Sequence, residues 1–415
     1  MVTDVWHPFT QLKGFEPLGR VVRARGAWME LHDGRRLLDG IASWWVNVHG
    51  HAHPHLVAAL QAQAQAFDQI ILADFVHGPV VELSHRLAAR LPGDLDHVFL
   101  SDDGSTSVEV ALKLAWQAQR ARGAHQRTRF VALEGGYHGD TLGAMRVGGR
   151  DVFSAPFEPL LGETTYLPWG DAEAAERFFA DHGHEVALCI AEPLLQGAGG
   201  MRLCAPDYLR RLAAAVQGAG ALFILDEVAT GFGRLGTFWA CEQADVVPDL
   251  LCMSKGITGG AMALGATGVR HELFELFLGA DKTSAFLHGH SYSGNPLACA
   301  VANASLDLFE QEDTLGRVAR MDAVYAARSE ELAALPGVRD VRHRGALLAF
   351  DLDGGPGGYL DPIGRRVQRA AMAEGLYVRP LGHVVYLWPP ACVTEEELQW
   401  AIDVLCRAVP AARSS

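Results

Sequence analysis

One lysine and one aspartate, each at the end of an apolar run, are the residues of this chain best placed to do chemistry. Lys255 follows the run LLCMS and precedes the glycines of GITGG, and Asp226 ends the run ALFILD. A lysine amine can condense with an aldehyde, and a carboxylate in a buried strand can keep a ring nitrogen protonated. The pair therefore indicates chemistry with pyridoxal phosphate, whose ring accepts the electrons of a carbanion. Either residue alone is ambiguous, because a lysine is usually solvated and an aspartate can cap a turn.

Two further segments offer groups that suit the same cofactor. Gly104 and Ser105 lie between a predicted strand and a predicted helix, where free backbone N–H groups and hydroxyls bind anions such as a phosphate. A serine there can also be an ordinary helix cap. Tyr137, in the glycine-rich segment EGGYHGD, can stack on a flat ring, although a packed core tyrosine is the commoner role. The adjacent His138 is expected to be a structural histidine.

No metal site is expected from the sequence. His288 and His290 are two residues apart, but no carboxylate or third ligand is spaced nearby. The cysteines lack C-x-x-C spacing, which indicates reduced thiols in a cytoplasmic protein rather than metal ligands or disulfides.

The composition is that of an ordinary globular protein and argues against two kinds of partner. The chain has 415 residues, of which 49% are hydrophobic and 20% charged, enough for one large and one smaller domain. Its net charge of −14 would repel a phosphate backbone, so no nucleic acid partner is expected. It contains neither an apolar run of about eighteen residues nor a secretory signal, so we expect no membrane span and no export.

Strand-like apolar runs alternate along the chain with stretches of helical periodicity. This alternation predicts the α/β class, with a mostly parallel sheet covered by helices and ligand groups at the carboxyl ends of its strands. The predicted strands are 97–101, 129–133, 186–192, 221–226 and 250–254. Over 106–122 five apolar residues recur at helical spacing and should share a buried face: Val108, Ala111, Leu112, Ala115 and Trp116.

We expect two domains. The large one covers residues 55–310, and the smaller α+β domain combines residues 1–54, which contain the hairpin-like GAWMELHDGRRLLDG, with residues 311–415. Thr394 and Glu397 are typical of a capping box at the start of the last helix. The cofactor cleft should lie between the two domains.

Taken together, these segments resemble the class III, fold-type I aminotransferases, which use pyridoxal phosphate. The resemblance extends from WHPFTQ near the N-terminus to the last predicted helix, and the combination of motifs is far more specific than any one of them. It implies that Lys255 binds the cofactor aldehyde, that Asp226 holds the ring nitrogen, and that Gly104 and Ser105 hold the phosphate. Tyr137 matches the aromatic residue that stacks on the ring. We expect three of these residues to be catalytic: Lys255, Asp226 and Tyr137. Of these, Lys255 and Tyr137 should also contact the substrate.

Within that family the chain is most similar to members that aminate 8-amino-7-oxononanoate in biotin biosynthesis with S-adenosylmethionine as donor. Ala198 stands where members acting on glutamate or 2-oxoglutarate carry a glutamate, and Ala229 stands where many relatives carry glutamine. The segments DGIASWWVNVHGHAHP and VRPLGHVVYLWPP resemble substrate-binding stretches of this branch. They imply that Trp44, with Trp45 beside it, forms an aromatic wall and that Arg379 binds the substrate carboxylate.

The resemblance also implies a homodimer with shared active sites. Gly289, His290 and Ser291 match a stretch that reaches the neighbouring subunit's cofactor phosphate and substrate. Three positions depart from the pattern of the best-known members. Ser291 replaces a threonine but keeps the hydroxyl, Phe9 lacks the phenol of a substrate-recognising tyrosine, and Asp103 replaces a common serine near the phosphate.

Several alternatives remain open at this point. Some members with the HGHSY pattern use lysine as the amino donor. An ω-amine or diamine aminotransferase with pyruvate as acceptor would share the fold, as would an aminomutase or a decarboxylase. A pyridoxal phosphate-binding regulatory module is disfavoured, because such modules usually carry a DNA-binding domain and this chain has neither spare length nor basic charge.

Overall fold

The computed structural model describes residues 4–355 and 357–414, whose strands form one seven-stranded sheet and three smaller sheets. The large sheet has the order β4-β12-β11-β10-β7-β5-β6, and its strands run parallel except β12, which is antiparallel to β11 and β4. The predicted α/β class and mostly parallel sheet are therefore confirmed. The strands are β4 (Leu95–Ser101), β5 (Arg129–Leu133), β6 (Thr165–Leu167), β7 (Val186–Ala191), β10 (Leu222–Asp226), β11 (Leu250–Met253) and β12 (Gly265–Arg270).

Both faces of the large sheet are buried, as its continuous apolar strands require. On β10, Leu222 belongs to a core cluster with helix α4 (Gly104–Ala121), whereas Phe223 belongs to the cluster that includes helix α7 (Pro206–Gly218). Successive side chains of a strand point to opposite faces, so α4 and α7 cover opposite faces of the sheet.

The helix predicted over 106–122 corresponds to α4. Four of the five residues predicted to share its buried face are buried, but the prediction for Trp116 was wrong. Its side chain is 37% exposed, and the Arg120 guanidinium lies 4.5 Å from the centre of its ring. Trp116 therefore lies at the edge of the buried face, where one side of the indole is covered by a charged side chain.

The other helices around the large sheet connect its strands or flank its edges. Helix α9 begins at Pro296, and the Asn295 side chain accepts a hydrogen bond from the Ala298 amide. The remaining α-helices are α2 (Pro54–Ala66), α3 (Gly78–Ala88), α5 (Leu142–Val147), α6 (Ala172–His182), α8 (His271–Glu275) and α9 (Pro296–Gln311). Short 3-10 helices are η1 (Ala155–Leu160), η2 (Gly183–Glu185), η3 (Ala240–Ala244), η4 (Lys255–Thr258) and η5 (Lys282–Ser284).

One of the three smaller sheets combines segments from both ends of the chain, whereas β13-β14-β16 is C-terminal and β8-β9 comes from the middle of the chain. Strand β15 pairs in parallel with β3, so the N-terminal hairpin and the C-terminal part share a four-stranded sheet of order β1-β2-β3-β15. Thr394 and Glu397 form the predicted capping box, each side chain accepting from the other's amide. The strands are β1 (Val21–Arg25), β2 (Trp28–Leu31), β3 (Arg36–Asp39), β8 (Leu195–Gln196), β9 (Arg202–Leu203), β13 (Val338–Arg344), β14 (Leu347–Leu352), β15 (Leu376–Tyr377) and β16 (Val384–Leu387). The helices are α10 (Thr314–Ala333), α11 (Ile363–Ala373) and α12 (Glu395–Ser414).

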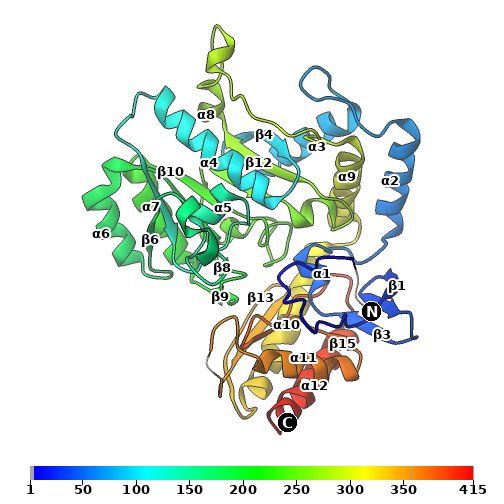
Figure 1. Ribbon diagram of the computed structural model, residues 1–415. Helices are drawn as coiled ribbons and strands as arrows, with labels where there is room; N and C mark the ends of the chain where they lie inside the picture. Colours follow the sequence, from blue (N-terminus) through cyan, green and yellow to red (C-terminus); the bar gives the residue numbers. More distant parts are fainter. Residues whose placement is uncertain (1–3, 356, 415) are drawn as a thin grey trace.

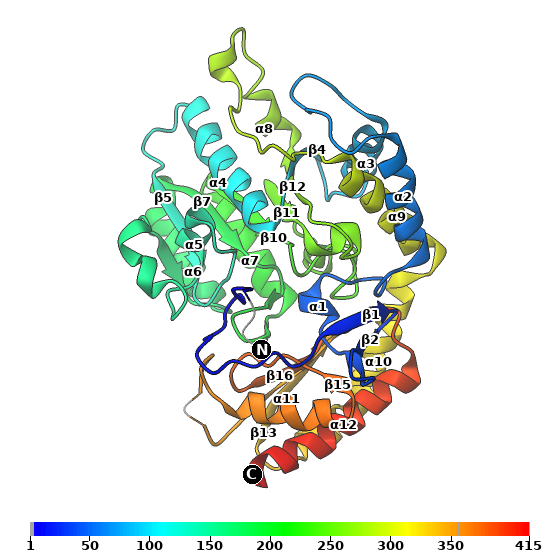
Figure 2. The same cartoon turned by 45° about the vertical axis from the view of Figure 1, so that its right-hand side comes forward.

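The short helix α1 (Ala42–Trp45) lies between the large sheet and the smaller sheets in both views (Figures 1 and 2). In Figure 1 the large sheet and its helices are above, and α10, α11, α12 and both termini are below. The domain boundaries near residues 54 and 310, which would separate the large domain from the small one, remain a proposal. Within the described part of the chain, no helix combines the length and the hydropathy that a membrane span requires.

Candidate active site

Five of the seven residues predicted to bind the cofactor line one cavity of about 450 Å³: Gly104, Ser105, Tyr137, Asp226 and Lys255. Asp226 is the last residue of β10, and Lys255 follows the end of β11 by two residues. Gly104 and Ser105 open α4 just after β4, and Tyr137 follows the end of β5. Because these strands end at the same edge of the sheet, the four loops that follow them converge there.

Asp226 is buried and is held from two sides. Its Oδ2 lies 2.7 Å from His138 Nδ1, and its Oδ1 accepts the Val228 amide at 3.0 Å. Burial disfavours protonation of His138, but the hydrogen bond to Asp226 and the charge of Asp226 outweigh it and raise the pKa of His138. A carboxylate has about four acceptor positions, so the two bonds leave room for a ring N–H. His138 therefore orients the predicted partner of the ring nitrogen, a contact that the sequence analysis did not anticipate.

Glu192 is a second residue of the cavity that the sequence analysis missed. It is buried, and its carboxylate accepts the amides of Tyr137 at 3.1 Å and Gly197 at 2.9 Å. Burial raises its pKa to about 7, against the opposing charge of His138. Glu192 directly follows β7 as Asp226 ends the neighbouring β10. An acidic residue directly after a buried parallel strand is the signal that would have identified it.

The Lys255 amine lies against the face of Trp45, with Nζ 4.9 Å from the ring centre. Burial lowers the pKa of Lys255, and the charges of Asp226 and Glu192 oppose that change. A lowered pKa increases the fraction of neutral amine, which is the nucleophilic form. Gly260, with φ 87°, is required close by, because a Cβ there would lie 2.6 Å from Asn47 Oδ1.

The N-terminus of α4 faces the same cavity. The Asp103 side chain caps the helix by accepting the Thr106 amide at 2.8 Å, so this carboxylate is engaged with the helix end. A side chain at Gly104 would clash with Val228, because a Cβ would lie 2.7 Å from its Cγ1. Helix N-termini carry unpaired N–H groups and bind anions. Together with the Ser105 hydroxyl, this helix end suits the phosphate of a cofactor.

Tyr137 contributes an aromatic ring and a hydroxyl to the cavity. Its hydroxyl donates to Asp140 Oδ2 at 2.8 Å, and burial raises its pKa. The phenol therefore stays protonated, and the ring is held by the Asp140 contact. Val228, which also lines the cavity, supplies an apolar surface from another loop.

Three of the predicted substrate residues line a second cavity of about 810 Å³: Phe9, Trp44 and Arg379. The Arg379 guanidinium lies 4.1 Å from the centre of the Trp44 ring, and the Phe9 ring contacts Trp44 edge-on at 5.4 Å. Trp45, the residue after Trp44, lines the first cavity. The indoles of two consecutive residues therefore line different cavities, Trp44 the second and Trp45 the first.

The backbone that presents these indoles is strained. Ala42, Ser43, Trp44 and Trp45 all have positive φ, at 49°, 48°, 78° and 71°. L-residues other than glycine lose about 1–2 kcal/mol each in this left-handed region. The surrounding structure must therefore compensate for this cost.

Gly289, His290 and Ser291 line neither of these two cavities. Gly289 and Ser291 are exposed, and the Ser291 carbonyl accepts a hydrogen bond from Gln69 Nε2 at 2.9 Å. The fold of one chain therefore separates these residues from the site, as expected if they serve a partner subunit.

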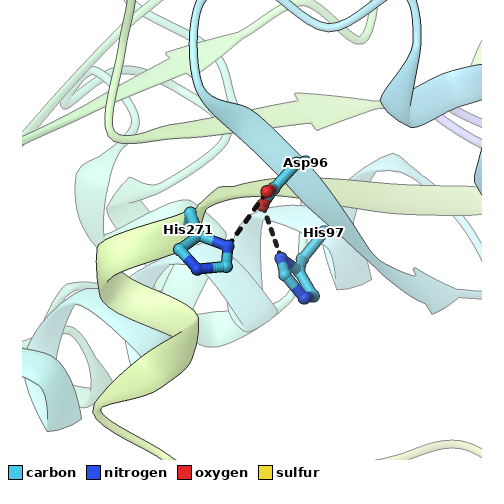
Figure 3. A group of neighbouring side chains, drawn as sticks. All are labelled: Asp96, His97 and His271. Atoms are coloured by element: carbon cyan, nitrogen blue, oxygen red, sulfur yellow. Dashed lines mark hydrogen bonds and ion pairs between the residues drawn. The ribbon is translucent and has the colours of Figure 1, made fainter.

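One group among the described residues has the composition of a metal site: Asp96, His97 and His271 (Figure 3). The Nδ1 atoms of His97 and His271 lie 2.5 and 2.9 Å from the two oxygens of Asp96. Asp96 lies near the start of β4, whereas the cavity lies beyond the end of that strand. Mutual hydrogen bonds at an exposed position account for this group.

Comparison with known proteins places this geometry in a family. Residues 13–409 match the family described as aminotransferase class-III. The chain is 47% identical to the adenosylmethionine-8-amino-7-oxononanoate aminotransferase of Synechococcus elongatus, over 95% of this chain and 96% of that protein. The crystal structure of the Methanocaldococcus jannaschii protein of the same name superposes with a TM-score of 0.95 at 33% identity, covering 98% and 97% of the two chains. An amine transaminase from an uncultivated Pseudomonas species, solved in its PLP-bound form, has a TM-score of 0.89 at 31% identity, covering 99% and 98%. The chain belongs to the class-III aminotransferase family and is an enzyme that transfers amino groups.

Glu192→Gln should change how stability depends on pH. The pKa of Glu192 rises from its ordinary 4.5 to about 7 on folding, so between these values the folded protein keeps a proton that the unfolded chain releases. This glutamate therefore lowers the free energy of unfolding as pH rises from about 4.5 to 7, by on the order of 1 to 3 kcal/mol. Denaturant unfolding of the variant should lack that decline. Glu395→Gln, at an exposed position, should retain it, and parallel curves for Glu192→Gln and the wild type would contradict the prediction.

Proposed function

We propose that this aminotransferase converts 8-amino-7-oxononanoate to 7,8-diaminononanoate in biotin biosynthesis, with S-adenosylmethionine as the amino donor. The observation that carries the proposal is the 47% identity, over nearly the whole chain, to a relative whose name contains both compounds. The two cavities support it, because one offers groups for a cofactor and the other offers a cation for a substrate carboxylate.

The cofactor we propose is pyridoxal phosphate, which the PLP-bound amine transaminase of similar fold also supports. Gly104 and Ser105 would hold its phosphate, Asp226 its ring nitrogen, Tyr137 the face of its ring and Lys255 its aldehyde. When bound, pyridoxal phosphate carries the amino group between the two substrates and accepts electrons from the carbon that loses a proton. The loops that end β4, β5, β10 and β11 supply these groups, so the sheet itself fixes their relative positions.

Lys255 is the proposed proton carrier. Its neutral amine takes a proton from the carbon that bears the amino group of the donor, and it delivers a proton to the carbon that receives the amino group in the acceptor. Asp226, oriented by His138, keeps the ring nitrogen protonated throughout. Because the amino group would be held on the cofactor between the two half-reactions, the deaminated donor can leave before 8-amino-7-oxononanoate binds, and the kinetics should be ping-pong.

Arg379 is the proposed partner of the substrate carboxylate. 8-Amino-7-oxononanoate carries its carboxylate far from its ketone, and a guanidinium binds a carboxylate with two parallel hydrogen bonds. Trp44 and Phe9 supply apolar surface beside it for the aliphatic chain. Ala198, which lines the first cavity, supplies no carboxylate that could pair with an arginine.

Arg379→Ala should weaken use of 8-amino-7-oxononanoate. Loss of a charge-assisted hydrogen bond predicts about a tenfold to hundredfold fall in kcat/KM, mainly through KM. Steady-state kinetics with each substrate varied in turn would measure it. Arg369→Ala removes another guanidinium that lines the same cavity, and it should have a smaller effect. An unchanged KM in Arg379→Ala would contradict the assignment.

Lys255→Ala should abolish turnover while leaving the fold intact. Without the amine no group carries the proton, and kcat should fall at least about a thousandfold. Turnover and the absorbance spectrum of bound cofactor would measure the effect. The control Lys282→Ala alters an exposed lysine in η5 and should keep full activity. Full activity in Lys255→Ala would refute its role.

One assay tests the proposed function as a whole. Purified protein with pyridoxal phosphate and 8-amino-7-oxononanoate is offered S-adenosylmethionine, lysine, glutamate or alanine separately, and the diamine product is measured. Diamine formed only with S-adenosylmethionine supports the proposal, and diamine formed only with lysine revises the donor. No diamine with any donor refutes the function.

A second function is favoured by the structural similarity to the Pseudomonas amine transaminase. Such an enzyme would transfer an amino group from an amine or a diamine to pyruvate. It would form alanine and would be indifferent to Arg379→Ala, so the same variant and the same assay separate the two functions.

We further propose a homodimer in which His290 and Ser291 reach the partner's site. The loop after α2 and the loop before α9 lie side by side, since Gln69 bonds to the Ser291 carbonyl and the Asn295 side chain donates to Gln69 Oε1 at 3.1 Å. We propose that their exposed apolar side chains together form the docking surface: Ile71, Phe75, Val76, Leu287 and Tyr292. Exposed apolar patches of this kind favour protein contacts, and the surface adjoins the residues assigned to the partner's site.

Phe75→Glu combined with Val76→Glu should shift the protein from dimer to monomer. These side chains are 61% and 74% exposed in the single chain, so charges there cost little in the monomer but disfavour an apolar interface. Light scattering coupled to size-exclusion chromatography would measure the mass. Leu160→Glu, at an exposed leucine in η1, should leave the mass unchanged, and a dimeric double variant would contradict the proposed surface.

A further inference from the structure

The turn formed by Ala42–Trp45, whose residues all have positive φ, is called the left-handed turn below. Asp39 precedes this turn in the chain and takes no part in the chemistry described above. It is the last residue of β3 and is fully buried. Its Oδ1 accepts the Ile41 amide at 3.2 Å. Its Oδ2 accepts the Ser43 amide at 2.7 Å, the Ser43 hydroxyl at 3.0 Å and His51 Nε2 at 2.9 Å. One carboxylate therefore accepts hydrogen bonds from the backbone amides on both sides of Ala42, the first left-handed residue.

His51 orients this carboxylate. Asn47 Nδ2 lies 3.4 Å from His51 Nδ1, and a proton on Nε2 points to the Asp39 carboxylate. The His51 backbone is fixed in turn, since it exchanges two hydrogen bonds with Gly26, at 3.0 and 2.7 Å. The imidazole therefore connects the Asp39 carboxylate to a rigid piece of backbone.

The turn needs such support because it contains no glycine. The residues of α1 are Ala-Ser-Trp-Trp, and all four adopt positive φ. Backbone strain of this kind persists only where surrounding contacts over-determine it, and it is concentrated at functional sites. The Ser43 amide, which Asp39 accepts at the shortest of the four distances, belongs to the second left-handed residue.

The strained turn delivers one indole to each cavity. The Trp45 ring lies 4.9 Å from Lys255 Nζ, and its Nε1 donates to the Tyr386 hydroxyl at 3.1 Å. The Trp44 ring lies 4.1 Å from the Arg379 guanidinium. A right-handed turn would direct the two indoles differently, and the proposed amine-bearing and carboxylate-binding ends of the site would lose their shared wall.

We propose that Asp39, oriented by His51, is a positioning residue for amino transfer, which holds the left-handed turn and thereby places Trp45 beside Lys255 and Trp44 beside Arg379. The inference rests on the proposed roles of Lys255 and Arg379. The arrangement of the turn itself is independent of those roles, so it can be tested whether or not the protein acts on 8-amino-7-oxononanoate.

The experiment compares Asp39→Asn with the wild type by kinetics and by fluorine NMR. In either orientation an asparagine NH₂ group would meet a backbone or ring donor, so the turn should relax. Displacement of catalytic neighbours by about 1 Å lowers rates by up to about a hundredfold, and we expect KM for 8-amino-7-oxononanoate to rise and kcat to fall. The chain has nine tryptophans. With 5-fluorotryptophan incorporated, the resonances of Trp44 and Trp45, assigned from Trp44→Phe and Trp45→Phe, should shift while the others stay.

Rescue and control variants separate positioning from general stability. Ser43→Gly should restore the resonances and the kinetics in the Asp39→Asn background, because glycine adopts positive φ without strain. Asp249→Asn removes a different buried carboxylate, which accepts the Phe223 amide at 2.7 Å before β11. It should lower stability yet leave the two resonances and KM unchanged. If Asp39→Asn does not fold, His51→Ala provides the milder form of the same test.

Each outcome decides the proposal. Unshifted Trp44 and Trp45 resonances in both Asp39→Asn and His51→Ala would overturn it, as would equal effects in Asp249→Asn or a failure of Ser43→Gly to rescue. A wild-type protein that forms no diamine refutes the proposed function instead, and the fluorine resonances still report whether Asp39 holds the turn.

Discussion

The site depends on the burial of charged groups of opposite sign in one small space. Lys255 is desolvated, which favours its neutral form, while the carboxylates of Asp226 and Glu192 favour its cation. An isolated buried carboxylate would be costly, and His138 removes that cost for Asp226 through a 2.7 Å contact. The result is a buried lysine whose neutral form is favoured by desolvation, beside an aspartate that His138 holds in place. The parallel strands, the helix N-terminus and the glycines of the cavity all position groups around this balance.

The sheet could be predicted because its strands are buried on both faces. Continuous apolar runs such as ALFILD and LLCMS have few alternatives to a covered, mostly parallel sheet, and their polar ends identified Asp226 and Lys255. Strand β12 was not predicted, because Gly265 and Gly268 interrupt its apolar pattern. Trp116 was placed on the buried face by periodicity alone, but a ring this large at the edge of the face is shielded by Arg120 instead. Local patterns thus predicted the strands and helices well, but they predicted less well which side chains at the edge of a buried face are exposed.

Some residues of the candidate site could be predicted from the sequence and others could not, for a physical reason. Gly104, Ser105 and Tyr137 follow strands and could be associated with a cofactor by position, whereas Arg379 and Phe9 lie in loops whose spacing carries no chemistry, and the resemblance to a family supplied them. His138 and Glu192 act through contacts across the fold, which no local pattern encodes. The left-handed turn is the clearest example of a feature that the sequence does not predict, because it contains no glycine. We infer that Asp39, distant donors and the packing of two indoles compensate for its strain.

The two cavities are built from different parts of the fold, which would let relatives with one fold act on different amines. The loops at the edge of the large sheet supply the groups that we propose bind the cofactor, and the sheet fixes their relative positions. The second cavity is lined by the N-terminal segment, strands β1 to β3, α1, α11 and the loop after β15, none of which belongs to that sheet. Substitutions there can change the substrate without disturbing the carboxylates around Lys255. The protein named for 8-amino-7-oxononanoate and the protein named for amine transamination superpose on this chain with TM-scores of 0.95 and 0.89. We therefore infer that substrate choice resides in the second cavity and in the turn that joins it to the first, rather than in the proposed catalytic lysine.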